Sequence, residues 1–361
     1  MRILTTLLQD DLTQVPDAAR AAEAAGYDGV VTAENRNDPF LSLAVAAVST
    51  SRISLQTGIA ISFSRSPMPV ANTSWDLQVA SRGRFVLGLG SQVRAHNENR
   101  FSVPWTPPAP RMREYVQALR AIWRCWETGE KLDFRGQHYK FTLMTPNFTP
   151  VSTHQPPVPI TIAAVGPAML RVAGEVCDGV RLHPFCTRRY IDDVVMRELR
   201  TGMLKSGRAR ERFEIVGGGF IATGPDEAAV AKMVEWVRYR VAFYGSTPAY
   251  WPVLEAHGLH DLGRKLNVMS KAAQWDAMAA EISDDVVRLF AAIGTYRDLA
   301  KAVAERFGGA ADAVTVSGGY GVHQDVPPDV IQDIRRIPSP FVGHLDMGGP
   351  ATGGPPKPPN T

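Results

Sequence analysis

The sequence has few cysteines, little net charge and no long apolar run. Its three cysteines, Cys125, Cys177 and Cys186, are an odd number without CxxC spacing. This pattern argues against a disulfide framework or a zinc site and fits a reducing compartment. A net charge of +3 over 361 residues is too small to indicate nucleic acid or an anionic membrane as a partner.

Targeting and metal-binding signals are also lacking. No apolar run approaches the roughly 18 residues of a membrane span, and the N-terminal residues run directly into Asp10 and Asp11 without a cleavage-like segment. His257 and His260 form an HxxH without the Glu of the metalloprotease pattern, so we expect no metal. The sequence therefore predicts a soluble, cytoplasmic protein.

The chain does have a regular alternation of strand-like and helix-like segments. Parallel neighbours in a sheet need crossover connections, which helices usually provide. Eight strands point to a closed α/β (β/α)8 TIM barrel, because open sheets of this class usually have fewer. The eight expected strands are 2–8, 27–35, 53–61, 84–90, 159–164, 178–183, 213–222 and 313–317.

Two segments interrupt this alternation. Residues 129–157 are proline-rich with a hairpin-like piece at 134–141, and residues 245–278 lose periodicity, with the piece 245–250 expected to form a loop near the site. We interpret both as insertions in one domain, 1–343. The Gly- and Pro-rich tail, 344–361, is expected to be disordered.

The strand and turn at 84–92 is the expected floor of a site. Its apolar run ends in Gly88-Leu89-Gly90, and six polar residues follow within eight positions: Ser91, Gln92, Arg94, His96, Asn97 and Glu98. Position 93 is Val, where a dinucleotide fingerprint needs a third glycine, so a Rossmann fold is disfavoured. The plainer alternative is a tight turn with a solvated polar tail.

In such a barrel, reactive groups lie at the C-terminal ends of the strands. Those ends carry Glu34 and Asn35, residues 60–64, residues 91–98, residues 163–167 and His183. The segment Ala163-Ala164-Val165-Gly166-Pro167 leads into a helix, where free N–H groups and the helix dipole suit phosphate. An ordinary strand-to-helix turn is the alternative.

These residues carry a resemblance. Gly58-Ile59-Ala60-Ile61, the run at 83–91 and residues 163–167 resemble the bacterial luciferase-like monooxygenase superfamily, and more narrowly its coenzyme F420-dependent oxidoreductases. The similarity covers about residues 1–320 and implies a barrel that binds a flavin or deazaflavin on its C-terminal face. It also implies a homodimer.

The resemblance further implies where the cofactor lies. A non-proline cis peptide at Ala60–Ile61 would back the ring. The implied cofactor-binding residues are Ala60, Ile61, Ser62, Gly90, Ser91, Gln92, Ala163, Ala164, Val165, Gly166 and Pro167.

Two residues are candidate proton donors for hydride-transfer chemistry. His96 is the first, because an imidazole titrates near neutral pH, and Glu34 is the second if burial favours its protonated form. A hydrogen-bonding role for His96 and a strand-end role for Glu34 are the alternatives. His183, Phe243, Tyr244 and Tyr250 are expected to line the substrate side, although aromatic residues at helix ends also serve as core.

Three functions remain open at this point. The preferred one is an oxidoreductase that moves a hydride between the F420 deazaflavin C5 and a small organic substrate. The second is an FMN-dependent, oxygen-using monooxygenase supplied with reduced cofactor by a separate reductase. The third is a cofactor-binding protein without turnover.

Overall fold

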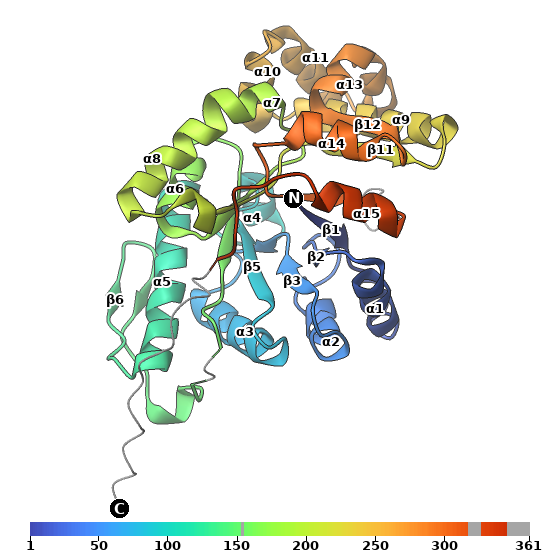
Figure 1. The fold of residues 1–361 in the computed structure, drawn as a ribbon. Helices are drawn as coiled ribbons and strands as arrows, with labels where there is room; N and C mark the ends of the chain where they lie inside the picture. The colour runs from blue at the N-terminus through green and yellow to red at the C-terminus, as the bar shows by residue number, and fades with distance from the viewer. Residues whose placement is uncertain (153–154, 317–325, 345–361) are drawn as a thin grey trace, which may run out of the picture.

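The computed structural model describes residues 1–152, 155–316 and 326–344, and its centre is a parallel sheet closed into a barrel (Figure 1). The strand order is β3-β2-β1-β13-β10-β9-β8-β5-β4, and β3 also pairs with β5. Because β3 and β4 occupy one position, the barrel has eight positions, and the predicted (β/α)8 TIM barrel is confirmed. The strands are β1 Arg2–Thr6, β2 Gly29–Thr32, β3 Ser54–Thr57, β4 Ala60–Ile61, β5 Phe85–Gly90, β8 Ile160–Ala164, β9 Gly179–Leu182, β10 Glu214–Gly217 and β13 Ala313–Val316.

Helices cover the outside of the barrel and explain the apolar runs in the strands. Every residue of β5 is buried, as expected for a strand with the barrel interior on one face and helices on the other. Inside the barrel, Leu4, Val31, Val216 and Ala313 form a small apolar cluster. The covering helices are α1 Val15–Ala25, α2 Leu41–Ser49, α3 Pro67–Ala80, α5 Pro108–Thr128, α6 Pro167–Val176, α8 Met196–Ser206 and α15 Pro328–Arg335.

The seventh expected strand, 213–222, is in fact two strands. The chain turns at Gly217 and Gly218, whose φ angles of 78° and 102° suit glycine far better than other residues. After this turn, β11 Phe220–Gly224 leaves the barrel and pairs in parallel with β12 Ala291–Thr295. The helix that precedes this strand, α13 Asp284–Phe290, ends where β12 begins.

The segment 245–278 is mostly helical, and the expected loop at 245–250 consists of a helix end, a short turn and a 3₁₀ helix. Pro248 and Pro252 lie in the first turns of two helices and Gly258 lies in a turn between helices, so the sequence has no long hydrophobic period. The short helices are η4 Pro248–Tyr250, α10 Trp251–Glu255, α11 His260–Lys271 and α12 Trp275–Met278. Together with α9 Glu227–Gly245, α13, α14 Leu299–Phe307 and the β11–β12 sheet, they form a group of elements beyond one end of the barrel (Figure 1).

The insertion 129–157 contains the expected hairpin, β6 Phe134–Arg135 with β7 Lys140–Phe141.

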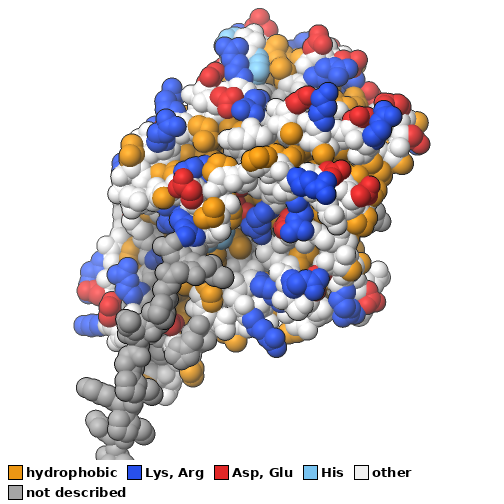
Figure 2. All heavy atoms as spheres, viewed as in Figure 1, with side chains coloured by type: hydrophobic (Ala, Val, Ile, Leu, Met, Phe, Trp, Pro, Cys, Tyr) orange, Lys and Arg blue, Asp and Glu red, His pale blue; other side chains and the backbone are white. Residues whose placement is uncertain are grey.

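Acidic and basic side chains are interspersed over the face in Figure 2, in keeping with the small net charge. None of the helices in the described ranges is long and apolar enough to span a membrane. All three cysteines are free and buried. The tail prediction for 344–361 concerns residues that, apart from His344, lie outside the described ranges.

Candidate functional site

The segment after β3 lies at the C-terminal mouth of the barrel. The cis peptide bond is Gly58–Ile59, so the expected position at Ala60–Ile61 is wrong by two residues. Gly58 and Ile59 are partly accessible, whereas Ala60 and Ile61 are buried. Surface presented to a ligand here therefore comes mainly from Gly58 and Ile59, which sequence reasoning did not select.

Glu34 anchors this segment through several contacts. Its carboxylate accepts hydrogen bonds from the Ile61 N–H at 2.7 Å and from Arg65 Nη1 at 2.8 and 2.7 Å. Arg65 Nη2 also donates to Asp38 at 3.0 Å. Burial opposes the charge on Arg65, but the hydrogen bonds and charges of Glu34 and Asp38 outweigh it and raise the pKa of Arg65. This geometry gives Glu34 a positioning role that competes with proton donation.

The turn after β5 is shaped by Gln92 and Asn97. Gln92 has a left-handed φ of 56°, and a short helix, α4 Arg94–Asn99, begins two residues later. The buried Asn97 donates from Nδ2 to the Ser91 carbonyl at 2.9 Å and to the Val93 carbonyl at 3.2 Å. Its Oδ1 is buried without a hydrogen-bond partner among the described residues. Asn97 thus holds the turn, and sequence reasoning did not distinguish it from its polar neighbours.

His96 lies on the outer side of this turn. Its side chain is exposed and makes no hydrogen bond to any described residue, while its carbonyl accepts from the N–H groups of Arg100 and Phe101 at 3.0 Å. Such a side chain has no orienting contact before a ligand binds. A donor role for His96 therefore stays a prediction without support from its surroundings.

The turn after β8 leads into α6 at Gly166 and Pro167. Gly166 is the N-cap, with φ −79° and ψ 155° and no side-chain cap, and a Cβ built on it would meet no atom within 4 Å. Because the first N–H groups of a helix lack intrahelical partners, this open turn is suited to an anion. Ala163, Val165, Gly166 and Pro167 are partly accessible, and Ala164 is buried.

Three of the four predicted substrate-side residues lie together. The His183 ring stacks on Tyr250 with centroids 4.6 Å apart and meets Tyr244 edge-on at 4.5 Å. Phe243 contacts Tyr244 at 5.3 Å but is 38% exposed and also faces Trp275. The cluster joins the end of β9 to the end of α9 and to η4, two neighbouring elements that come much later in the sequence.

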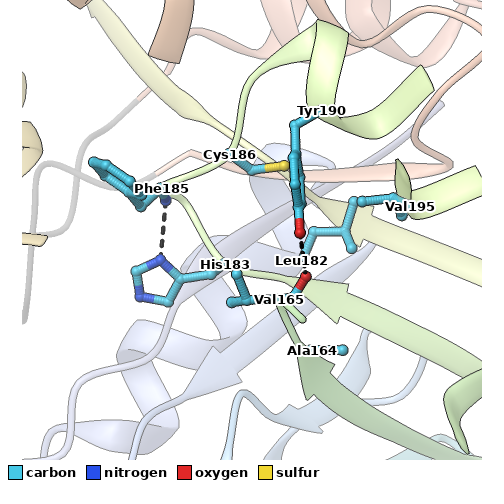
Figure 3. Close-up of a pocket in the computed structure, with 8 residues that line it drawn as sticks. All are labelled: Ala164, Val165, Leu182, His183, Phe185, Cys186, Tyr190 and Val195. Carbon is cyan, nitrogen blue, oxygen red and sulfur yellow. Dashed lines mark hydrogen bonds between the residues drawn. The ribbon is translucent and has the colours of Figure 1, made fainter. Parts of the chain in front are cut away.

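The protonation state of His183 follows from its contacts. The Phe185 N–H donates to His183 Nδ1 at 3.0 Å, so the neutral ring carries its proton on Nε2 (Figure 3). Burial, assisted by the charge of Arg240, lowers the pKa of His183 to about 3. Nε2 has no hydrogen-bond partner among the described residues. His183 therefore offers one oriented N–H at neutral pH.

A hollow connects His183 with the turn after β8 (Figure 3). It contains about 170 Å³ of space outside atoms, part of it open to solvent. Tyr190 closes one side by donating its hydroxyl to the Val165 carbonyl at 3.0 Å. Its lining residues are Ala164, Val165, Leu182, His183, Phe185, Cys186, Tyr190 and Val195. Between its lining atoms there is no room for even a water-sized sphere, so the hollow as it stands is not a ligand pocket.

Metal ligands do not gather at this site or elsewhere in ranges 1–152, 155–316 and 326–344. No group of three His, Cys, Asp or Glu side chains there has the arrangement needed to hold a metal ion. The polar groups at the barrel mouth are therefore backbone N–H groups and the side chains of His183, Glu34 and Arg65. Arg181 lies further inside the barrel.

Comparison with known proteins agrees with the fold and identifies the family. The family model described as luciferase-like monooxygenase matches residues 3–313. An uncharacterized protein of Mycobacterium tuberculosis is 46% identical over 91% of this chain and 96% of its own. A 5,10-methylenetetrahydromethanopterin reductase of Archaeoglobus fulgidus is 28% identical over 79% of this chain and 83% of its own.

A solved structure extends the comparison to three dimensions. The coenzyme F420-dependent tetrahydromethanopterin reductase of Methanopyrus kandleri superimposes with a TM-score of 0.73 at 20% identity, covering 93% of this chain and 97% of that chain. At this identity the likeness supports the barrel fold alone. The match over residues 3–313 nevertheless means that the chain belongs to the luciferase-like monooxygenase family.

Proposed function

We propose that the protein is an F420-dependent oxidoreductase that transfers a hydride between the deazaflavin C5 and a small organic substrate. The observation that carries this proposal is the open, uncapped turn at Gly166, which the strand order β4-β5-β8 separates by one strand from the accessible Gly58–Ile59 segment. Sequence relatives support this cofactor, since a putative coenzyme F420-dependent oxidoreductase of Mycobacterium tuberculosis is 31% identical over 58% of this chain and 62% of its own.

The residues present fit such a cofactor. The turn 163–167 would hold a phosphate through the free N–H groups at the start of α6. Gly90 lets the Ile59 side chain pack directly against β5, because a Cβ there would lie 2.5 Å from Ile59 Cδ1. When bound, the deazaflavin would donate or accept the hydride, and the protein would position it and exclude water.

Side chains of the protein would act on the substrate. His183 Nε2–H would donate a hydrogen bond to a carbonyl or imine, and the rings of Tyr244 and Tyr250 hold the imidazole for this contact. A neutral imidazole can polarise such a group by donating a hydrogen bond, without carrying a positive charge itself. Glu34 would act through Arg65 and the Ile61 N–H by fixing the platform. His96 and Phe243 would meet the substrate at the outer edge.

An FMN-dependent monooxygenase is the second candidate. The matching family is named for monooxygenases, and an uncapped helix N-terminus accepts the FMN phosphate equally well. A separate reductase would then supply reduced cofactor. A binding protein without turnover is the third candidate, and it predicts tight binding without substrate-dependent reoxidation. A homodimer also stays a prediction.

Fluorescence titration of the purified protein with F420, and separately with FMN, tests the proposal. We expect micromolar binding of F420 and far weaker binding of FMN. Preference for reduced FMN would instead support the assignment as an FMN-dependent, oxygen-using monooxygenase. Binding of neither would exclude both enzyme assignments.

A further inference from the structure

Arg181 is a charged residue in a buried strand of the barrel. It lies on β9 opposite Ala163 of β8 and Val216 of β10, and only 8% of its surface is accessible. Its Nη2 donates to Gln56 Oε1, and this is the only hydrogen bond of its side chain to any of the described residues. Its buried Nε has no partner among the described residues. A buried guanidinium with so few partners calls for a functional explanation.

Arg181 forms no direct ion pair with any described residue, although Glu214 attracts its positive charge. The neighbouring interior carboxylate, Glu214, is 2.6 Å from Arg2 and forms its ion pair there. No carboxylate of the described residues lies within 4.0 Å of the Arg181 guanidinium. Burial is the main reason that the pKa of Arg181 is lowered to about 10. The attraction of Glu214 opposes this shift, and the repulsion of Arg2 adds to it. Arg181 is thus charged at neutral pH, and its partner Gln56 is neutral.

Two glycines lie against this guanidinium. A Cβ on Gly88 of β5 would lie 3.0 Å from Arg181 Nε, and a Cβ on Gly58 would lie 3.3 Å from Nη1. Gly58 is also partly accessible from the barrel mouth. Arg181 therefore lies directly below the segment proposed to support the cofactor ring. Its guanidinium group contacts that segment from inside the barrel.

We infer that Arg181 is a positioning residue that supplies a fixed positive charge beneath the ring, so that the protein binds reduced F420 more tightly than oxidised F420. This inference rests on the proposed function. Addition of a hydride, two electrons and one proton, to the oxidised ring adds one negative charge to it. A nearby cation in a medium of low dielectric constant stabilises the form with the additional negative charge.

A purely structural role for Arg181 predicts something different. Loss of the side chain would then weaken the binding of both cofactor forms by the same factor, because packing does not distinguish ring charge. The ratio of the two dissociation constants, oxidised over reduced, separates the two roles without any measurement of turnover.

The experiment measures this ratio anaerobically, without substrate, in the full-length protein and four variants. Arg181→Met removes the charge, and Arg181→Lys keeps it. Gln56→Glu leaves Arg181 in place but gives it a carboxylate partner with almost no change in shape. Arg297→Met removes a charge from an 86% exposed side chain and serves as the control.

We expect Arg181→Met and Gln56→Glu to lower the ratio at least tenfold, equivalent to about 30 mV in the potential of a two-electron couple. Arg181→Lys and Arg297→Met should stay within about threefold of the unmodified protein. If Arg181→Met does not fold, Gln56→Glu and Arg181→Lys still decide the matter. An unchanged ratio in Gln56→Glu would overturn the inference while leaving the proposed function intact. Failure of the unmodified protein to bind either form would overturn both.

Discussion

Glu34 and Arg65 form an ion pair at 2.7 Å that links the loop after β2 to the segment after β4. Their side chains are 9% and 24% exposed, so the pair is largely, though not fully, shielded from water. Because Glu34 also binds the Ile61 N–H, this one carboxylate determines the path of the chain at the barrel mouth.

Replacement of Glu34 by Ala should therefore destabilise the protein by about 2 kcal/mol, since it leaves Arg65 and the Ile61 N–H without this partner. Urea unfolding measures the change. The control is Glu98→Ala, which removes the exposed pair with Arg94 and should cost no more than about 0.5 kcal/mol. Equal losses in both variants would contradict an anchoring role for Glu34.

Two glycine-to-alanine variants distinguish packing from ligand approach. Gly90→Ala places a methyl group 2.5 Å from Ile59 Cδ1 and should destabilise the fold by about 1 to 3 kcal/mol. Gly166→Ala meets no atom within 4 Å and should leave stability within about 0.5 kcal/mol, yet weaken F420 binding at least fivefold. Thermal unfolding and cofactor titration are the two measurements. Unchanged cofactor binding in Gly166→Ala would argue against a phosphate at this turn.

His183 predicts a specific pH dependence. Its pKa, lowered by burial and by Arg240 to about 3, lies below the ordinary value of 6.5. The unfolded chain therefore binds a proton that the folded protein excludes between these two pH values, and stability falls as pH decreases from about 6.5 towards 3. His183→Gln should lose part of this dependence in urea unfolding at pH 7.5 and pH 5. Nitrogen NMR at pH 5 should show a neutral ring protonated on Nε2. A charged ring at that pH would contradict the structure.

The turn that ends β10 gives a fourth prediction. Gly218 has a φ of 102°, and a Cβ there would also lie 2.9 Å from Ile191 Cδ1. Gly258 has a φ of 71° with no atom within 4 Å of such a Cβ. Gly218→Ala should thus cost clearly more than Gly258→Ala, whose loss of about 1 kcal/mol reflects backbone conformation alone. Similar losses in the two variants would show that contact with Ile191 contributes little.

The barrel could be predicted from the sequence because its strands are short apolar runs separated by strong helical patterns. The strand β12 was missed, since Ala-Ala-Ile-Gly-Thr has few of the branched and aromatic residues that favour strands. Within 245–278, η4, α10 and α12 are too short to show a period, whereas α11 has 12 residues and was missed although its pattern is amphipathic.

The site could be predicted less well. Strand ends indicated the rim of the barrel on which the turn at Gly166 and the cluster of His183 with Tyr244 and Tyr250 lie. The partners of Glu34 could not be found, because Arg65 lies 31 positions away along the chain. Arg181 gave one signal, a charge within the strand Gly-Val-Arg-Leu, but only the closed barrel shows that this charge lies inside.

The pairing of β1 with β13 has a consequence for synthesis on the ribosome. The first strand of the chain completes its hydrogen bonds only with the last strand of the sheet. During translation β1 must therefore remain with one unpaired edge, a surface that invites association with other nascent chains. Chaperone dependence during expression should accordingly persist until translation has passed residue 316.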